Sequence, residues 1–68
     1  MNDAVDPVDI AIGARMRLRR KSLGISQGVL SERVGVSFQQ IQKYERGANR
    51  VSGSMLVAIA SALDTSVG

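Results

Sequence analysis

The sequence is divided at short intervals by residues that start helices and residues that end them. A Ser or Asp side-chain oxygen can accept the free N–H groups at a helix start, and glycine can adopt the left-handed conformation that ends a helix. The candidate starts are Asp6-Pro7, Ser26, Ser37 and Ser52, and the candidate stops are Gly24, Gly35 and Gly47. This spacing predicts four short helices, over about residues 7–23, 27–34, 38–46 and 53–63. No segment alternates as a strand would, so the predicted fold class is all-α, a compact bundle.

Apolar residues recur along these segments with the helical period, and they identify the expected core. The first segment contributes Ile12, Met16 and Leu23. The later segments contribute Leu30, Val34, Ile41, Tyr44, Met55, Leu56, Ile59, Ala60 and Leu63. Val36, in the turn before Ser37, is expected to pack beneath that turn. The chain of 68 residues has no cysteine or histidine, so it must fold by packing, without disulfides or a zinc finger.

The same composition excludes several kinds of function. Thiolate chemistry and histidine acid–base catalysis are absent, the acidic residues form no convincing pair, and the serines are explained by capping. We therefore expect no enzyme, no metal, no cofactor and no small-molecule ligand. No apolar run reaches the roughly 18 residues of a membrane helix, and the N-terminus lacks the features of a signal peptide. The expected location is the cytoplasm.

Charge is distributed unevenly along the chain. Asp3, Asp6 and Asp9 all lie in the first nine residues, and residues 1–7 are expected to form an acidic, disordered arm. Residues 10–50 hold nine basic residues and two acidic ones, a net charge of +7. Such an excess favours a polyanion or an acidic surface as partner, and a merely solvated basic helix face is the alternative.

The third segment, "SFQQIQKYERG" at residues 37–47, separates into an apolar side and a polar side. Ile41 and Tyr44 point inward, with Glu45 at the edge. The outward residues are Gln39, Gln42, Lys43 and Arg46, with Phe38 and Gln40 at the borders. Glutamine amides match the adenine edge in the major groove of DNA, whereas Lys and Arg match guanine or phosphates. This side has no acid, although an ordinary exposed helix face mixes charges of both signs.

The spacing of the second and third segments strengthens this interpretation. A helix, a three-residue Gly-Val-Ser turn and another helix, over residues 27–46, match the helix-turn-helix motif, whose second helix enters the major groove. Gln27 stands at the start of the first motif helix, where free N–H groups and the helix dipole attract phosphate. The sequence therefore predicts a nucleic-acid-binding unit at residues 27–46.

Residues 12–67 resemble the DNA-binding domain of the phage repressor and Cro type, the xenobiotic-response-element family. The most specific elements are Leu-Gly-Ile-Ser-Gln at 23–27, Gly-Val-Ser at 35–37 and Tyr-Glu-Arg-Gly at 44–47. The resemblance implies a lambda-repressor-like domain of four or five helices over residues 8–68. It also implies sequence-specific binding of double-stranded DNA as a transcriptional regulator, usually as a homodimer on a near-palindromic operator. Because the family often continues into a fifth helix, a chain trimmed before that helix is one interpretation.

The resemblance also implies roles for individual residues. It makes Phe38, Gln39 and Lys43 base readers, with Gln40 and Gln42 as further candidates. It makes Gln27 a phosphate contact, and it makes Asn49 and Arg50 part of a loop that follows the DNA backbone. We expect further phosphate contacts from Ser37 and Arg46. The resemblance pairs Arg20 with Glu45 in a structural ion pair.

Arg19 and Leu18 are among the departures from the family pattern. Arg19 stands where the family more often has leucine, and its stem is expected to pack while its guanidinium reaches water or phosphate. Leu18 is expected to face outward.

The alternative function is a protein-interaction module of the same fold, such as an antitoxin or a partner of the transcription machinery. The sequence has neither the acidic face on the third helix nor the extended apolar patch that would favour it.

Overall fold

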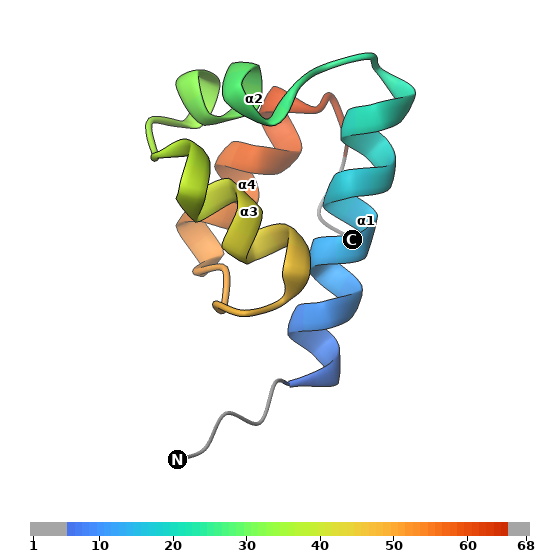
Figure 1. Cartoon of the computed structure of the whole chain (residues 1–68), viewed down its shortest axis with the longest axis vertical. Coiled ribbons are helices and arrows are strands. Elements are labelled where there is room, and N and C mark those ends of the chain that lie inside the picture. The colour runs from blue at the N-terminus through green and yellow to red at the C-terminus, as the bar shows by residue number, and fades with distance from the viewer. Residues whose placement is uncertain (1–5, 66–68) are drawn as a thin grey trace.

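A computed structural model describes residues 6–65, which form four helices and contain no strand (Figure 1). The helices are α1 (Pro7–Ser22), α2 (Gln27–Val34), α3 (Phe38–Arg46) and α4 (Gly53–Ala62). α3 packs against both α1 and α2, and α4 lies behind α3 and contacts α2. The predicted all-α bundle is therefore confirmed, and α2 and α3 lie within residues 27–46.

Each helix begins at the predicted capping side chain. The carboxylate of Asp6 accepts a hydrogen bond from the N–H of Val8 at 2.8 Å. The hydroxyls of Ser26, Ser37 and Ser52 each accept one from the third residue along, at 3.1, 3.0 and 3.2 Å. Since α1 starts at Pro7, the last two residues of the expected 1–7 arm form the cap and first residue of this helix. Residues 1–5 and 66–68 lie outside the described part of the chain. The predictions for the rest of the acidic arm and for an ending before a fifth helix concern these residues.

The core lies where the four helices meet, and it largely consists of the predicted residues. Its fully buried side chains are Leu30, Ile41, Ile59 and Leu63, and Met16 and Val51 are nearly so. Leu23 was expected in this core, but it is 41% exposed. α1 ends at Ser22, so Leu23 occupies the C-cap position, where the chain leaves the helical stripe. Ile25 packs against the core instead.

Two glycines allow α1 and α3 to approach until their backbones touch. A Cβ atom at Gly13 would overlap the carbonyl oxygen of Tyr44 and lie 2.7 Å from that of Glu45. A Cβ atom at Gly47 would lie 2.7 Å from the Cα of Ile10, and Gly47 also has a φ of 75°. Backbone atoms cannot move aside as the end of a flexible side chain can. A larger residue at either position must therefore push α1 away from α3.

A buried ion pair joins the same two helices farther along α1. Nε of Arg20 donates to Oε2 of Glu45 at 2.7 Å, and Nη2 donates to Oε1 at 3.0 Å. Only 9% of the Arg20 side chain and 3% of the Glu45 side chain are exposed. Nη1 of Arg20 donates to the carbonyl of Ile25 at 2.9 Å, so the same guanidinium also holds the turn after α1. The predicted structural pair is thus present and more deeply buried than an edge position suggested.

The charge of Arg20 does not depend on pH in any ordinary range. The hydrogen bond from Arg20 to Glu45 raises the pKa of the guanidinium above its usual value, and the nearby negative charge adds to this, although burial opposes it. Because the pKa of Arg20 is higher in the folded than in the unfolded state, the contribution of this pair to stability is fully present below the unfolded-state pKa. It is lost only as pH rises through the folded-state pKa. For an arginine that window is strongly alkaline, so the cation persists at neutral pH.

Arg19 has a structural role that corrects the expectation for its guanidinium. Its Nε donates to the carbonyl of Leu63 at 2.9 Å, and its Nη2 donates to the carbonyl of Asp64 at 3.0 Å. These carbonyls lie at the C-terminal end of α4, where the helix dipole favours a cation. Arg33 donates to the carbonyl of Ala62 at 3.3 Å. Two arginines therefore hold the end of α4, and Arg19 is directed at backbone oxygens rather than at water or phosphate.

The close helix contact predicts a large effect of Gly13→Ala. The added methyl group would overlap backbone oxygens, so we expect the free energy of unfolding to fall by about 2–3 kcal/mol. Gly53→Ala is the matched control, since a Cβ there meets nothing within 4 Å. We expect that change to be neutral or to stabilise by up to about 1 kcal/mol. Denaturant unfolding followed by circular dichroism measures both, and similar values for the two variants would contradict the close contact.

The buried ion pair predicts a second contrast. Glu45→Ala leaves Arg20 buried without a counter-charge and is expected to lower the free energy of unfolding by about 3–5 kcal/mol. Arg50→Ala removes a pair whose closest distance is 3.4 Å and whose arginine side chain is 74% exposed, so we expect a loss below about 1 kcal/mol.

A double variant separates the buried charge from the lost volume. Replacing the pair together, with Arg20→Met and Glu45→Leu, removes both charges and is expected to recover much of the stability lost in Glu45→Ala. Thermal melts of the unaltered protein, of Glu45→Ala and of the double variant compare their stabilities. A double variant that is less stable than Glu45→Ala would show that the unpaired charge is not the cause.

Candidate nucleic-acid interface

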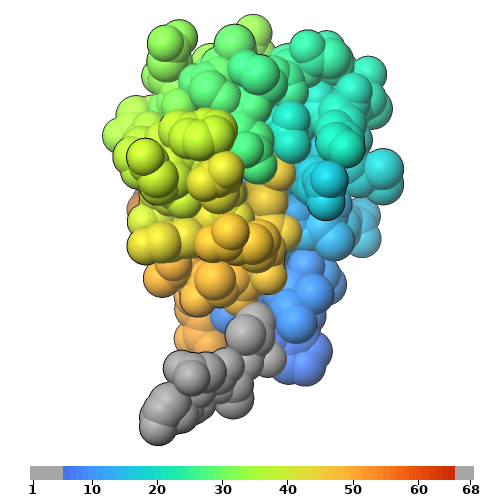
Figure 2. Space-filling view, in the orientation of Figure 1, coloured from blue at the N-terminus to red at the C-terminus, as the bar shows by residue number. Residues whose placement is uncertain are grey.

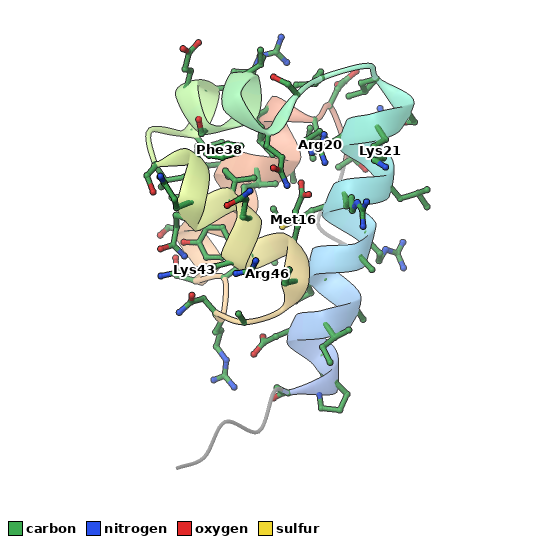
Figure 3. The ribbon with its side chains drawn as sticks, in the orientation of Figure 1. Met16, Arg20, Lys21, Phe38, Lys43 and Arg46 are labelled. Atoms are coloured by element: carbon green, nitrogen blue, oxygen red, sulfur yellow. The ribbon has the colours of Figure 1, made fainter. Side chains whose placement is uncertain are left out.

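α3 is anchored to the core on one side and exposes the other side to solvent. Its exposed residues are Phe38, Gln39, Lys43 and Arg46. Phe38 is 44% exposed and stands at the start of the helix, whereas Arg46 stands at its end (Figure 3). Figure 2 shows the side chains of α3 on the same face as those of α2 and the second half of α1. The three elements therefore form one continuous surface.

Gln40 and Gln42 differ in position from the four exposed residues of α3. Both are half-buried, as expected for Gln40 at the border of the helix face. Gln42 was expected on the outward side of the helix, with Gln39, Lys43 and Arg46. It lies instead along a cleft between α3 and α1, because α3 is pressed close to α1 by the contacts at Gly13 and Gly47. Its side chain is consequently less open to solvent than those of Gln39 and Lys43.

This cleft separates α3 from the second half of α1 and from the start of α2. It has a volume of about 490 Å³. The Arg20–Glu45 pair lies in it, and Arg17 and Arg46 line it from α1 and α3. Arg17 is exposed and was not among the predicted site residues. Its spacing of three residues from Arg20 places both on one side of α1, and this was the sequence pattern that could have indicated it.

Gln27 is fixed in this cleft by the ion pair. Its Nε2 donates a hydrogen bond to Oε1 of Glu45 at 2.9 Å. The carboxylate of Glu45 therefore receives hydrogen bonds from both α1 and α2. An amide nitrogen carries two hydrogens, so one hydrogen of Gln27 remains for a second acceptor. The predicted phosphate contact of Gln27 stays a prediction, and the structure adds a structural role to it.

The remaining predicted phosphate contacts lie at the two ends of α3. Ser37 is exposed, and its oxygen accepts the capping bond from Gln40 while its hydroxyl hydrogen stays available to another acceptor. Asn49 and Arg50 are exposed in the loop after α3. Arg50 faces the carboxylates of Asp6 and Asp9 at 3.4 and 3.7 Å. These contacts are long and open to solvent, so they hold Arg50 only weakly.

The electrostatic character of this face follows from these positions. Lys43, Arg46 and Arg17 are exposed, while Glu45 is neutralised by Arg20. The described residues contain no group of three acidic, His or Cys side chains that could hold a metal ion. Among the helices of residues 6–65, none is long and apolar enough to cross a membrane. The parts of the surface that α1 and α3 supply are thus positively charged, with amide groups and the exposed ring of Phe38.

Comparison with known proteins identifies the family. Residues 16–68 match the model of a helix-turn-helix family. An HTH-type transcriptional regulator of Sinorhizobium medicae (strain WSM419) is 53% identical over 62 residues, which cover 91% of this chain and 45% of that protein. The repressor protein C2 of Salmonella phage P22 is 42% identical over 55 residues, covering 81% of this chain and 26% of the phage protein. The chain spans about half the length, or less, of these curated relatives.

Solved structures agree with this assignment. The clp gene regulator ClgR from Corynebacterium glutamicum has a TM-score of 0.89 at 31% identity, covering 94% of this chain and 68% of that one. The P22 c2 repressor, solved in complex with a synthetic operator, has a TM-score of 0.78 at 41% identity, covering 82% of this chain and 85% of that one. The chain belongs to the helix-turn-helix family, and α2, the Gly-Val-Ser turn and α3 are its motif.

Proposed function

We propose that this domain binds double-stranded DNA in a sequence-specific manner, as a bacterial or phage transcriptional regulator, with α3 in the major groove. The observation that carries the proposal is the solvent side of α3. It presents amides and cations without an exposed acid, on a helix fixed to α1 by backbone contact and a buried ion pair. A helix that reads bases must be held in place in this way, since hydrogen bonds to base edges depend on the position of each side chain.

The positions along α3 support a division of roles. Gln39 and Lys43 are the exposed candidates for hydrogen bonds to base edges, and Phe38 is placed to touch a thymine methyl group. Gln40 and Gln42 are half-buried and stay secondary candidates. The proposed phosphate contacts are Gln27, Ser37, Arg46, Asn49 and Arg50. These contacts would set the register on the duplex, and the base contacts would select the sequence.

Two relatives support the proposal that the domain binds DNA. The P22 c2 repressor was solved with a synthetic operator, and the biofilm regulator SinR, 33% identical with a TM-score of 0.77, was solved in complex with DNA. We extend this to the present chain and propose a homodimer on a near-palindromic operator, because two-fold protein symmetry is matched by two half-sites. A regulator of this kind acts on the DNA of the cytoplasm, which we propose as the location.

One observation favours the alternative of a protein-interaction module. A largely apolar groove of about 930 Å³ lies between α1 and α4, and Leu18 beside it is 72% exposed. A SinR–SinI protein complex is also among the similar structures, with a TM-score of 0.76 at 33% identity. The groove is on the other side of α1 from the cleft, so a protein contact there would leave α3 open to DNA. Salt-sensitive binding to mixed duplex DNA separates the functions, because a pure interaction module would not show it.

Lys43→Ala tests the orientation of α3. We expect it to relax base preference at one position of each half-site, with a loss of about 1–3 kcal/mol of discrimination. Arg50→Ala also removes one positive charge, but at a proposed phosphate contact. It is expected to weaken binding to all DNA sequences equally. Fluorescence anisotropy with an operator duplex and its single-base variants measures both effects. If Lys43→Ala also weakened binding to every duplex to the same extent, Lys43 would contact phosphate, and the proposed orientation of α3 in the major groove would be wrong.

Selection of duplexes from a random pool with the purified domain tests the mode of binding. We expect a near-palindromic consensus whose half-sites lie about one helical turn apart, because each protomer would place one α3 in the groove. A single, non-repeated consensus would argue against the dimer while leaving DNA recognition intact. A pool that is not enriched for any sequence would argue against sequence-specific recognition.

A further inference from the structure

We propose that Arg17 is a ligand of the DNA backbone, and that Arg17 and Arg46 hold one phosphodiester group between them in the cleft between α1 and α3. The proposal rests on the proposed function and adds to it a contact on α1, outside the helix-turn-helix motif. It would bring one strand of DNA against the surface that α1 and α3 share.

The hydrogen bonds of the arginines in α1 single out Arg17. Arg19 is committed to the carbonyls at the end of α4, and Arg20 is committed to Glu45 and the carbonyl of Ile25. Within residues 6–65, Arg15 and Arg17 make no side-chain hydrogen bond or ion pair. Arg15 lines the apolar groove toward α4, whereas Arg17 lines the cleft toward α3. Arg17 is therefore the uncommitted arginine of α1 on the proposed DNA side.

Arg46 supplies the opposite wall of the cleft. It is exposed at the end of α3 and has no acidic partner within residues 6–65 (Figure 3). α1 and α3 cannot move apart easily, because they are joined at Gly13 and by the Arg20–Glu45 pair. The two guanidinium groups are thus carried by helices with a fixed relation to each other. A ligand that binds both would lose little freedom of the protein itself.

The charge of the cleft fits an anion. The negative charge of Glu45 is neutralised by Arg20, which leaves Arg17 and Arg46 as the uncompensated charges lining the cleft. A planar guanidinium binds phosphate oxygens through paired N–H groups, which makes arginine well suited to a phosphodiester. The cleft, with a volume of about 490 Å³, has room for a phosphate group. The cleft opens beside Phe38, at the edge of the helix that is proposed to lie in the groove.

The test compares Arg17→Gln with Arg15→Gln. Both residues are exposed on α1, and each substitution removes one positive charge. Binding to a mixed-sequence duplex is measured by fluorescence anisotropy at several salt concentrations, so the operator need not be known. We expect Arg17→Gln to weaken binding on the order of tenfold and to lower the slope of log affinity against log salt by about 0.9. Arg15→Gln is expected to leave the slope unchanged. Arg17→Lys keeps the charge and is expected to restore most of the slope.

Each result has a definite meaning. Equal losses in Arg17→Gln and Arg15→Gln would overturn the contact, because only the net charge would matter, while DNA binding itself would stand. Absence of salt-sensitive binding by the unaltered protein would overturn the proposed function and this contact together. Repeating the titration in inorganic phosphate and in chloride at equal ionic strength tests whether the free ion competes for the same cleft. A difference between the variants that is present in chloride and narrows in phosphate would support the contact, whereas no difference between them in chloride would overturn it.

Discussion

The backbone contact between α1 and α3 at Gly13 is the constraint on which the remaining geometry depends. A glycine inside a helix weakens that helix by roughly 1 kcal/mol relative to alanine. Here the missing side chain lets the carbonyl oxygens of Tyr44 and Glu45 lie directly against α1. Two turns farther along, Arg20 reaches Glu45 from the same side of α1. Because the two attachments lie at separate points of α1, they fix the angle of α3 as well as its distance.

The buried polar groups link α3 to α1 and to α2. Exchanging a buried ion pair for apolar residues is often neutral or stabilising, so Arg20 and Glu45 are not explained by stability alone. Their geometry explains them better. Glu45 accepts hydrogen bonds from Arg20 on α1 and from Gln27 on α2, and Arg20 also holds the carbonyl of Ile25. One carboxylate on α3 therefore sets the positions of α1, of α2 and of the turn between them.

The sequence predicts those parts of the fold that depend on near neighbours. Caps, glycine stops and the helical period involve residues within a turn or two, and they were sufficient for four helices and for the motif. The resemblance to a family supplied the Arg20–Glu45 pair. The sequence could not indicate the partner of Gly13 on α3, or the partners of Arg19 at Leu63 and Asp64, because these contacts join distant segments. The proposed roles of the α3 side chains depend further on where bound DNA would lie, which no local pattern encodes.

Several of the basic residues at positions 10–50 are used by contacts within the fold. Arg19, Arg20 and Arg33 donate hydrogen bonds to carbonyls or to Glu45, and they are therefore occupied by the fold. Arg15 faces the apolar groove on the other side of α1. Net charge thus overstates the number of phosphates that the domain can contact. Each phosphate contact contributes about 0.9 to the slope of log affinity against log salt concentration. Only the cations on the α3 side should therefore contribute to this slope. The fold itself determines how many charges remain for the proposed contact with DNA.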